Sequence, residues 1–152
     1  MFTILAGAAA VAASAAVQPA PAPAVTLGDI RMHLLYQETG RLSPDISPPN
    51  EFIGWNTVIG EGSAEESASD MVVVAELRTQ GEQAFERPLT ITVRSGRRVL
   101  GQRRFNSMLT SDQGRVYLPL WLKDVGCAGL IRVEVTFGRE RKSETLALNC
   151  GE

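Results

Sequence analysis

Most hydrophobic residues of this chain occur in short runs rich in Val, Ile, Leu and Thr, bounded by Gly, Pro, Asp or Ser. Such runs are typical of β-strands, and helical periodicity is scarce. The number and spacing of the runs predict an all-β fold, a single antiparallel β-sandwich. About seven strands are expected, over residues 29–37, 71–77, 89–93, 99–105, 116–122, 129–137 and 140–148.

The last two predicted strands are joined by Gly138-Arg139 and flanked by the only two cysteines, Cys127 and Cys150. Glycine at the first central position favours a two-residue type II′ turn. That turn pairs Phe137 with Glu140, and counting outward along both strands brings the two cysteines opposite each other. The sequence therefore predicts a C-terminal hairpin stapled by a disulfide, which is typical of oxidising compartments.

An earlier hairpin is expected around Ser95-Gly96, with its register left open. A two-residue turn would place Ile91 opposite Leu100, whereas one extra residue would place Val93 opposite Val99. Gly101 is a candidate position for a β-bulge. Both registers keep the hairpin.

Two further segments bear on the arrangement of the strands. Pro119 interrupts an alternating run and cannot donate to a ladder, so its strand is expected at a sheet edge or at a bulge. Phe52 to Ile59 predicts a short strand or an apolar strap laid on the sheet.

The N-terminal region has a different composition from the rest of the chain. An apolar run over residues 2–13 ends in small residues, which predicts a signal peptide over 1–16. The run is too short to span a bilayer. Residues 17–26 contain QPAPAPA and are expected to form a Pro/Ala-rich spacer, followed by one β-sandwich domain over 27–152. Periplasmic or secreted localisation follows as the expectation.

Charge is distributed unevenly, although the whole chain has a net charge of −2. Residues 25–86 hold 11 acidic and 3 basic residues, a net charge of −8, while 87–152 hold 12 basic and 6 acidic residues, a net charge of +6. The two halves either attract each other within the fold or form a bipolar surface that steers a charged partner.

Two groups of side chains are candidate binding residues. One is the arginine cluster around Ser95-Gly96, whose guanidinium groups suit carboxylates, phosphates or anionic polysaccharide, unless they only protect an edge strand. The other is a pair of aromatics near Pro119, expected either beneath the Phe52–Trp55 strap or in a partner-binding patch. The candidates are Arg94, Arg97, Arg98, Arg103, Arg104, Tyr117 and Trp121.

Catalytic and metal-binding constellations are scarce. His33 is the single histidine and lies on the predicted polar face of the first strand. One histidine does not supply a zinc or copper site, and no nucleophile motif is present. Acidic residues between 60 and 70 leave two alternatives open, a calcium site (Glu61, Glu65, Glu66, Asp70) and a carboxylate-dependent hydrolase (Asp45, Glu61, Asp70). No cofactor is expected.

Asp124-Val125-Gly126 resembles the Asp-x-Gly turn between strands E and F of many immunoglobulin-superfamily domains. The resemblance implies an immunoglobulin-like sandwich at the level of the fold. Ala128 stands where a tyrosine would follow that turn, and the cysteines join a hairpin instead of bridging two sheets.

The sequence favours an exported non-catalytic binding or accessory module of the cell envelope, whose partner is a protein or an anionic envelope component. Nucleic acid is not expected as a partner, because the chain is acidic overall. The alternative is a structural subunit of a surface assembly that uses N-terminal strand exchange.

Overall fold

The computed structural model describes residues 24–151, so the expected signal peptide and most of the spacer lie outside the described residues. The pairings between the strands are all antiparallel. One short 3-10 helix, η1 (Thr57–Ile59), lies between the first two strands. The strands are β1 (Thr26–Leu35), β2 (Asp70–Arg78), β3 (Ala84–Phe85), β4 (Leu89–Ser95), β5 (Arg98–Phe105), β6 (Met108–Leu109), β7 (Arg115–Leu122), β8 (Gly129–Phe137) and β9 (Glu140–Leu148).

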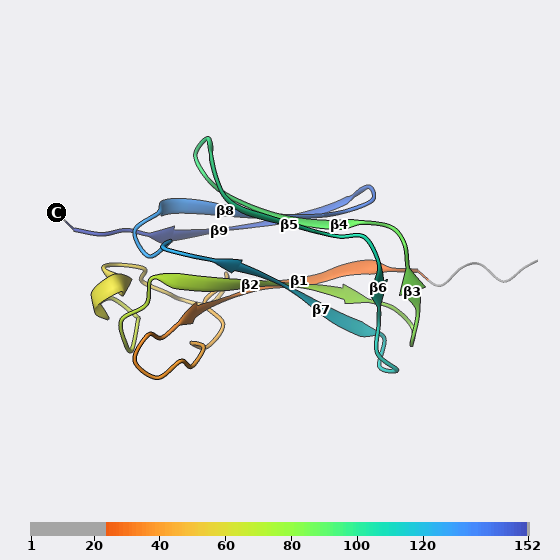
Figure 1. Ribbon diagram of the computed structural model, residues 1–152, viewed down its shortest axis with the longest axis horizontal. Coiled ribbons are helices and arrows are strands. Elements are labelled where there is room, and N and C mark those ends of the chain that lie inside the picture. Colours follow the sequence, from red (N-terminus) through yellow and green to blue (C-terminus); the bar gives the residue numbers. More distant parts are fainter. Residues whose placement is uncertain (1–23, 152) are drawn as a thin grey trace, which may run out of the picture.

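Seven long strands form two layers (Figure 1). One layer has the order β1-β2-β7 and the other has the order β5-β4-β8-β9, while the short strands β3 and β6 pair at one end. This arrangement confirms the predicted all-β, immunoglobulin-like antiparallel sandwich. In the part of the chain that the structure describes, no helix is long and apolar enough to cross a membrane.

Alternating residues of the long strands fill the space between the two sheets. Phe137 is fully buried there and its ring meets that of Phe85 edge to face, with the centroids 6.2 Å apart. The same alternation leaves polar residues on the outer faces. Fully buried core residues include Met32, Leu34, Met71, Val73, Leu77, Leu89, Ile91, Val93, Ile131, Val133, Phe137 and Leu148.

The C-terminal hairpin has the predicted register. Phe137 pairs with Glu140, the pairing continues to Gly129 and Leu148, and Cys127 and Cys150 form a disulfide with their Cα atoms 5.2 Å apart. Gly138 has a φ of 60°, as the first central residue of a type II′ turn requires. Turn chemistry and cysteine spacing therefore specified this element correctly.

The β4–β5 hairpin has neither of the predicted registers. Its turn is Gly96-Arg97, and Val93 pairs with Gly101 while Arg94 pairs with Val99. Leu100 is thus the extra residue of a bulge, next to the glycine at which a bulge was predicted. The packing explains the difference, because Gly101 lies against Leu122 of the other sheet with no room for a side chain.

Two expectations about the N-terminal half needed correction. β1 begins at Thr26 and ends at Leu35, not at 29 and 37, because a bulge between Leu27 and Ile30 lets the strand start earlier. The Phe52–Trp55 strap lies beside the end of β9, where Asn149 donates to Gly54. It does not cover β7.

Pro119 lies in an edge strand, as predicted, since β7 ends its sheet. Arg103 of β5 donates to the carbonyl oxygen of Pro119 at 2.9 Å. A proline without N–H and an occupied carbonyl protect this edge against further strand pairing.

Candidate functional site

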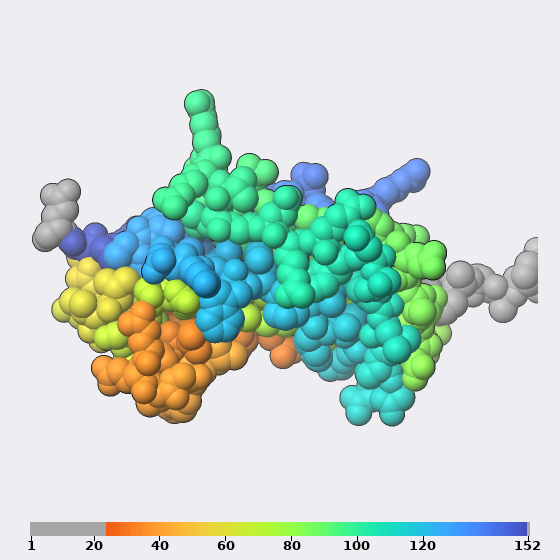
Figure 2. Space-filling view, viewed as in Figure 1, coloured from red at the N-terminus to blue at the C-terminus, as the bar shows by residue number. Residues whose placement is uncertain are grey.

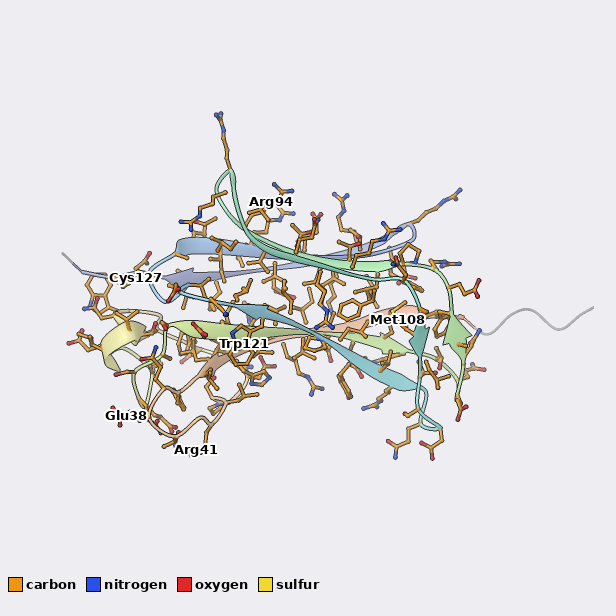
Figure 3. The ribbon with its side chains drawn as sticks, in the orientation of Figure 1. Glu38, Arg41, Arg94, Met108, Trp121 and Cys127 are labelled. Carbon is orange, nitrogen blue, oxygen red and sulfur yellow. A yellow bond between two sulfur atoms is a disulfide. The ribbon has the colours of Figure 1, made fainter. Side chains whose placement is uncertain are left out.

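The outer face of the four-stranded sheet and the adjoining hairpin tip carry three of the five arginines of the predicted cluster. Arg94 and Arg104 lie on this face and Arg97 lies at the tip of the β4–β5 hairpin, whereas Arg98 pairs with Ser95, in register with the buried Ile131, and therefore lies on the side of the other sheet. Figure 3 shows Arg94 on the side of its sheet that faces away from the other layer. The hairpin tip projects from the body of the molecule in Figure 2.

Arg132 of β8 joins this cluster although it was not a candidate from the sequence. Arg94 pairs directly with Arg132 across the neighbouring strands, so two like charges stand side by side. Such a pair is destabilising in a folded sheet. The nearest acid of the face, Glu134, pairs instead with Arg141 at 3.6 Å. No sequence signal could reveal Arg132, because β4 and β8 are neighbours only in the folded sheet.

We call Arg94, Arg97, Arg104 and Arg132 the arginine face. All four side chains are exposed. Among residues 24–151, none of them forms a salt bridge with an acidic side chain. Their charge is therefore available to a partner.

Arg103, the remaining arginine candidate, does not belong to this face. Its guanidinium lies 4.6 Å from the centre of the Phe105 ring and reaches Pro119 across the open side of the sandwich. These contacts give Arg103 a role in closing that side of the two layers.

The aromatic candidates lie on the opposite outer face of the molecule. Tyr117 and Trp121 of β7 are 44% and 46% exposed, so the expected cover by the strap is absent from the described part of the chain. Trp121 donates to Asp70 at 3.1 Å, and the guanidinium of Arg31 lies 5.3 Å from the Tyr117 ring centre. The two candidate surfaces therefore cannot form one binding site.

A buried carboxylate, Glu76, lies close to Tyr117. The β1 bulge folds over it so closely that a Cβ atom at Gly28 would lie 2.7 Å from its Oε2 atom. Burial acts to raise the pKa of Glu76, but hydrogen bonds from Arg78 and from the Asp29 N–H, together with the charges of Arg78 and Arg115, outweigh it and lower the pKa. Glu76 is thus a structural anion of the three-stranded sheet.

Replacing this carboxylate by an amide tests its role. Glu76→Gln should lower the free energy of unfolding by about 1 kcal/mol at pH 7, because hydrogen bonds to a charged group contribute more than neutral ones. The folded pKa is depressed, so this stability is present above the usual pKa of 4.5 and is lost as the pH falls through the folded value. In urea unfolding, the free energies of unfolding of the wild type and of Glu76→Gln should converge at pH values below the folded pKa of Glu76. A constant difference down to pH 2 would contradict this role.

The other ionisable candidates are engaged separately. Nδ1 of His33 lies 2.9 Å from the Ser43 carbonyl oxygen, and Asp45 accepts hydrogen bonds from Ser47. Glu61 accepts from the side chain of Asn56 at 2.7 Å. Residues 24–151 contain no cluster of three His, Cys, Asp or Glu side chains that could hold a metal ion.

Comparison with known proteins leaves the family open. No protein-family model and no curated protein sequence matches this chain. Among solved structures, a β-glucosidase from Erythrobacter marinus aligns with 82% of this chain at 12% identity and a TM-score of 0.43. The chain spans 15% of the length of that protein.

Proposed function

We propose that this chain is an exported, non-catalytic binding module of the periplasm or of the secreted fraction, whose arginine face binds an anionic partner. The observation that carries the proposal is the pair Arg94 and Arg132, held side by side without an acidic partner among the described residues. Like charges in direct opposition cost stability, and an anion bound between them would remove that cost.

The disulfide and the surface charge support the two parts of the proposal. The Cys127–Cys150 bridge is compatible with an oxidising compartment. The chain is acidic overall, whereas the arginine face groups four cations, so an anionic partner would be attracted to that face. Sulfated, phosphorylated and carboxylated polymers share the chemistry that guanidinium groups bind.

The two Gly-Arg turns provide a matched pair of variants. Arg97 and Arg139 each follow the glycine of a two-residue turn, but the turns lie at opposite ends of the sheet, because Ser95 pairs with Ile131 while Leu89 pairs with Phe137. Arg97→Ser should weaken the binding of heparin or polygalacturonate severalfold, and Arg139→Ser should leave it unchanged. Equal loss in both variants would show that net charge alone decides binding, and no binding to either polymer would argue against the arginine face.

A stability measurement separates a binding role from a structural one. Arg132→Thr should raise the free energy of unfolding by about 0.2–1 kcal/mol, because it removes the like-charge pair and adds a residue suited to strands. The same variant should bind the polyanion less tightly. Urea unfolding and fluorescence anisotropy check the two results, and a destabilised Arg132→Thr would indicate that the side chain serves the fold.

A further inference from the structure

The outer edge of β9 has hydrogen-bonding groups that the described chain does not use. The residues flanking the two-residue turn, Phe137 and Glu140, exchange their backbone hydrogen bonds, so alternate residues of β9 point toward β8. The intervening residues Arg141, Ser143 and Thr145 point their N–H and C=O groups away from β8. None of these six groups has a backbone partner in residues 24–151, and β9 is the last strand of its sheet.

The same edge is already used a few residues farther along. Asn149 donates to the Gly54 carbonyl at 2.7 Å and accepts from the Asn56 N–H at 2.8 Å. This isolated parallel bridge lies one residue beyond β9, so the continuation of its edge already pairs with another segment. The strap pairs at Asn149 alone, so the outward groups of Arg141, Ser143 and Thr145 remain open among the described residues.

A groove of about 530 Å³ runs beside the open edge. Lys142 and Glu144 of β9 line it together with Ile30, Pro48 and Pro49 and with polar side chains of β1 and of the following loop, among them Asp29, His33 and Asp45. An extended strand added to β9 would therefore have one face over this groove and the other face in solvent beside Arg141, Ser143 and Thr145.

The sequence before β1 has a matching period. In QPAPAPA, prolines at 19, 21 and 23 alternate with alanines at 20, 22 and 24. In an extended strand, alternate residues direct their backbone groups to opposite sides. Proline at every second position therefore removes the N–H groups from one edge of such a strand only. The other edge keeps the N–H and C=O groups of all three alanines. Such a strand pairs with one neighbour and ends the sheet, as edge prolines do.

We propose that residues 18–24 of one copy of this chain add to the β9 edge of a second copy, antiparallel to it. The N–H and C=O groups of the three alanines pair with Arg141, Ser143 and Thr145. Because paired residues of antiparallel strands share a face, the alanine methyl groups lie beside those three side chains and the proline rings enter the groove. Main-chain hydrogen bonds of this kind are the basis of β-strand addition.

The position of β1 favours a second copy over the same chain. Leu27 donates to the Glu140 carboxylate at 3.0 Å, and Lys142 donates to the Gly28 carbonyl at 2.8 Å, so β1 runs parallel to β9. A segment antiparallel to β9 in the same chain would have to reverse direction between Ala24 and Thr26, where β1 already begins. A second copy meets no such constraint, and β1 stays in its own sheet.

A synthetic peptide of residues 17–25 tests the pairing on the full chain. Amide NMR should show shifts and slowed hydrogen exchange at Arg141, Ser143 and Thr145. The control peptide, in which QPAPAPA becomes QPPAAPA, has the same composition without the alternation and should bind at least about tenfold more weakly, because it cannot present three donors to one edge. Equal binding of the two peptides, or shifts at another surface, would overturn the proposal.

Sedimentation of the full chain tests the assembly. Ala20→Pro with Ala22→Pro removes two donors and should weaken self-association at least about tenfold. Pro21→Ala keeps the donor row, so it should retain association. Ser143→Pro removes an edge N–H that takes no part in the β8–β9 ladder, so it should also weaken self-association. Circular dichroism checks that this variant folds. A wild-type chain that stays monomeric at millimolar concentration, or amide protection at the three positions that is independent of concentration, would overturn the proposal. Neither test depends on whether the arginine face binds a polyanion.

Discussion

Loss of the Cys127–Cys150 bridge should lower the free energy of unfolding by about 3 kcal/mol. The bridged residues are 23 positions apart, and the chain-entropy model gives a cost of this size for the loop that they close in the unfolded state. The corresponding fall in Tm is roughly 10 °C for a domain of this length. Urea unfolding of Cys127→Ser with Cys150→Ser, compared with the wild type, measures the difference.

Reduction of the disulfide by dithiothreitol provides the control for this prediction. Dithiothreitol should destabilise the wild type by the same amount as the double substitution and should leave the double variant unchanged. A reduced wild type as stable as the oxidised protein would mean that native contacts alone hold the hairpin in place.

Gly101→Val should destabilise the sandwich by about 1–3 kcal/mol, the usual cost of forcing additional volume into a packed core. A Cβ atom at this position would overlap the side chain of Leu122, which is 1% exposed in the core. The substitution should therefore push β5 away from β7. Urea unfolding measures the loss.

The neighbouring residue offers a matched control. Gln102 lies on the outer face of the same strand and is exposed, so Gln102→Val adds the same side chain without overlap. The loss should be smaller than for Gly101→Val, because the strand propensity of valine offsets the lost hydrogen bond from Gln102 to Thr92. If both variants lost the same stability, the close approach of β5 and β7 would not be the cause.

Local chemistry explains which parts of the fold could be predicted. The register of the last hairpin follows from Gly138, whose turn type determines every pair up to Gly129 and Leu148. The edge position of β7 follows from Pro119 in the same way. In both cases one residue type restricts the backbone regardless of what packs around it.

Interactions between distant segments explain the rest. The run Phe52–Trp55 is apolar, but nothing in its pattern specifies β9 as its neighbour. The bulge at Leu100 depends on how closely Gly101 approaches the other sheet. Glu76 is 1% exposed beneath the β1 bulge, a contact that the sequence of β2 alone does not specify.

The candidate site shows the same division. The hairpin arginines are visible in the sequence because they are adjacent along the chain, but Arg132 becomes their neighbour only through the pairing of β4 with β8. Arg103 fits the composition of the cluster, yet its pairing with Ile91 places it on the inner side of β5. The strand register therefore decides that Arg103 helps to close the sandwich and does not belong to the arginine face.

The bonding of β1 has a consequence for the order of folding. Its pairs with β2 join residues 35 to 52 positions apart, and its bonds with Glu140 and Lys142 join residues 113 and 114 positions apart. During synthesis the first strand cannot complete its contacts until the last hairpin has emerged, and non-local pairing of this kind makes folding slow. The C-terminal hairpin, whose contacts are local, can close and oxidise before the first strand is held, so the chain is expected to acquire its covalent bridge early and its N-terminal strand last.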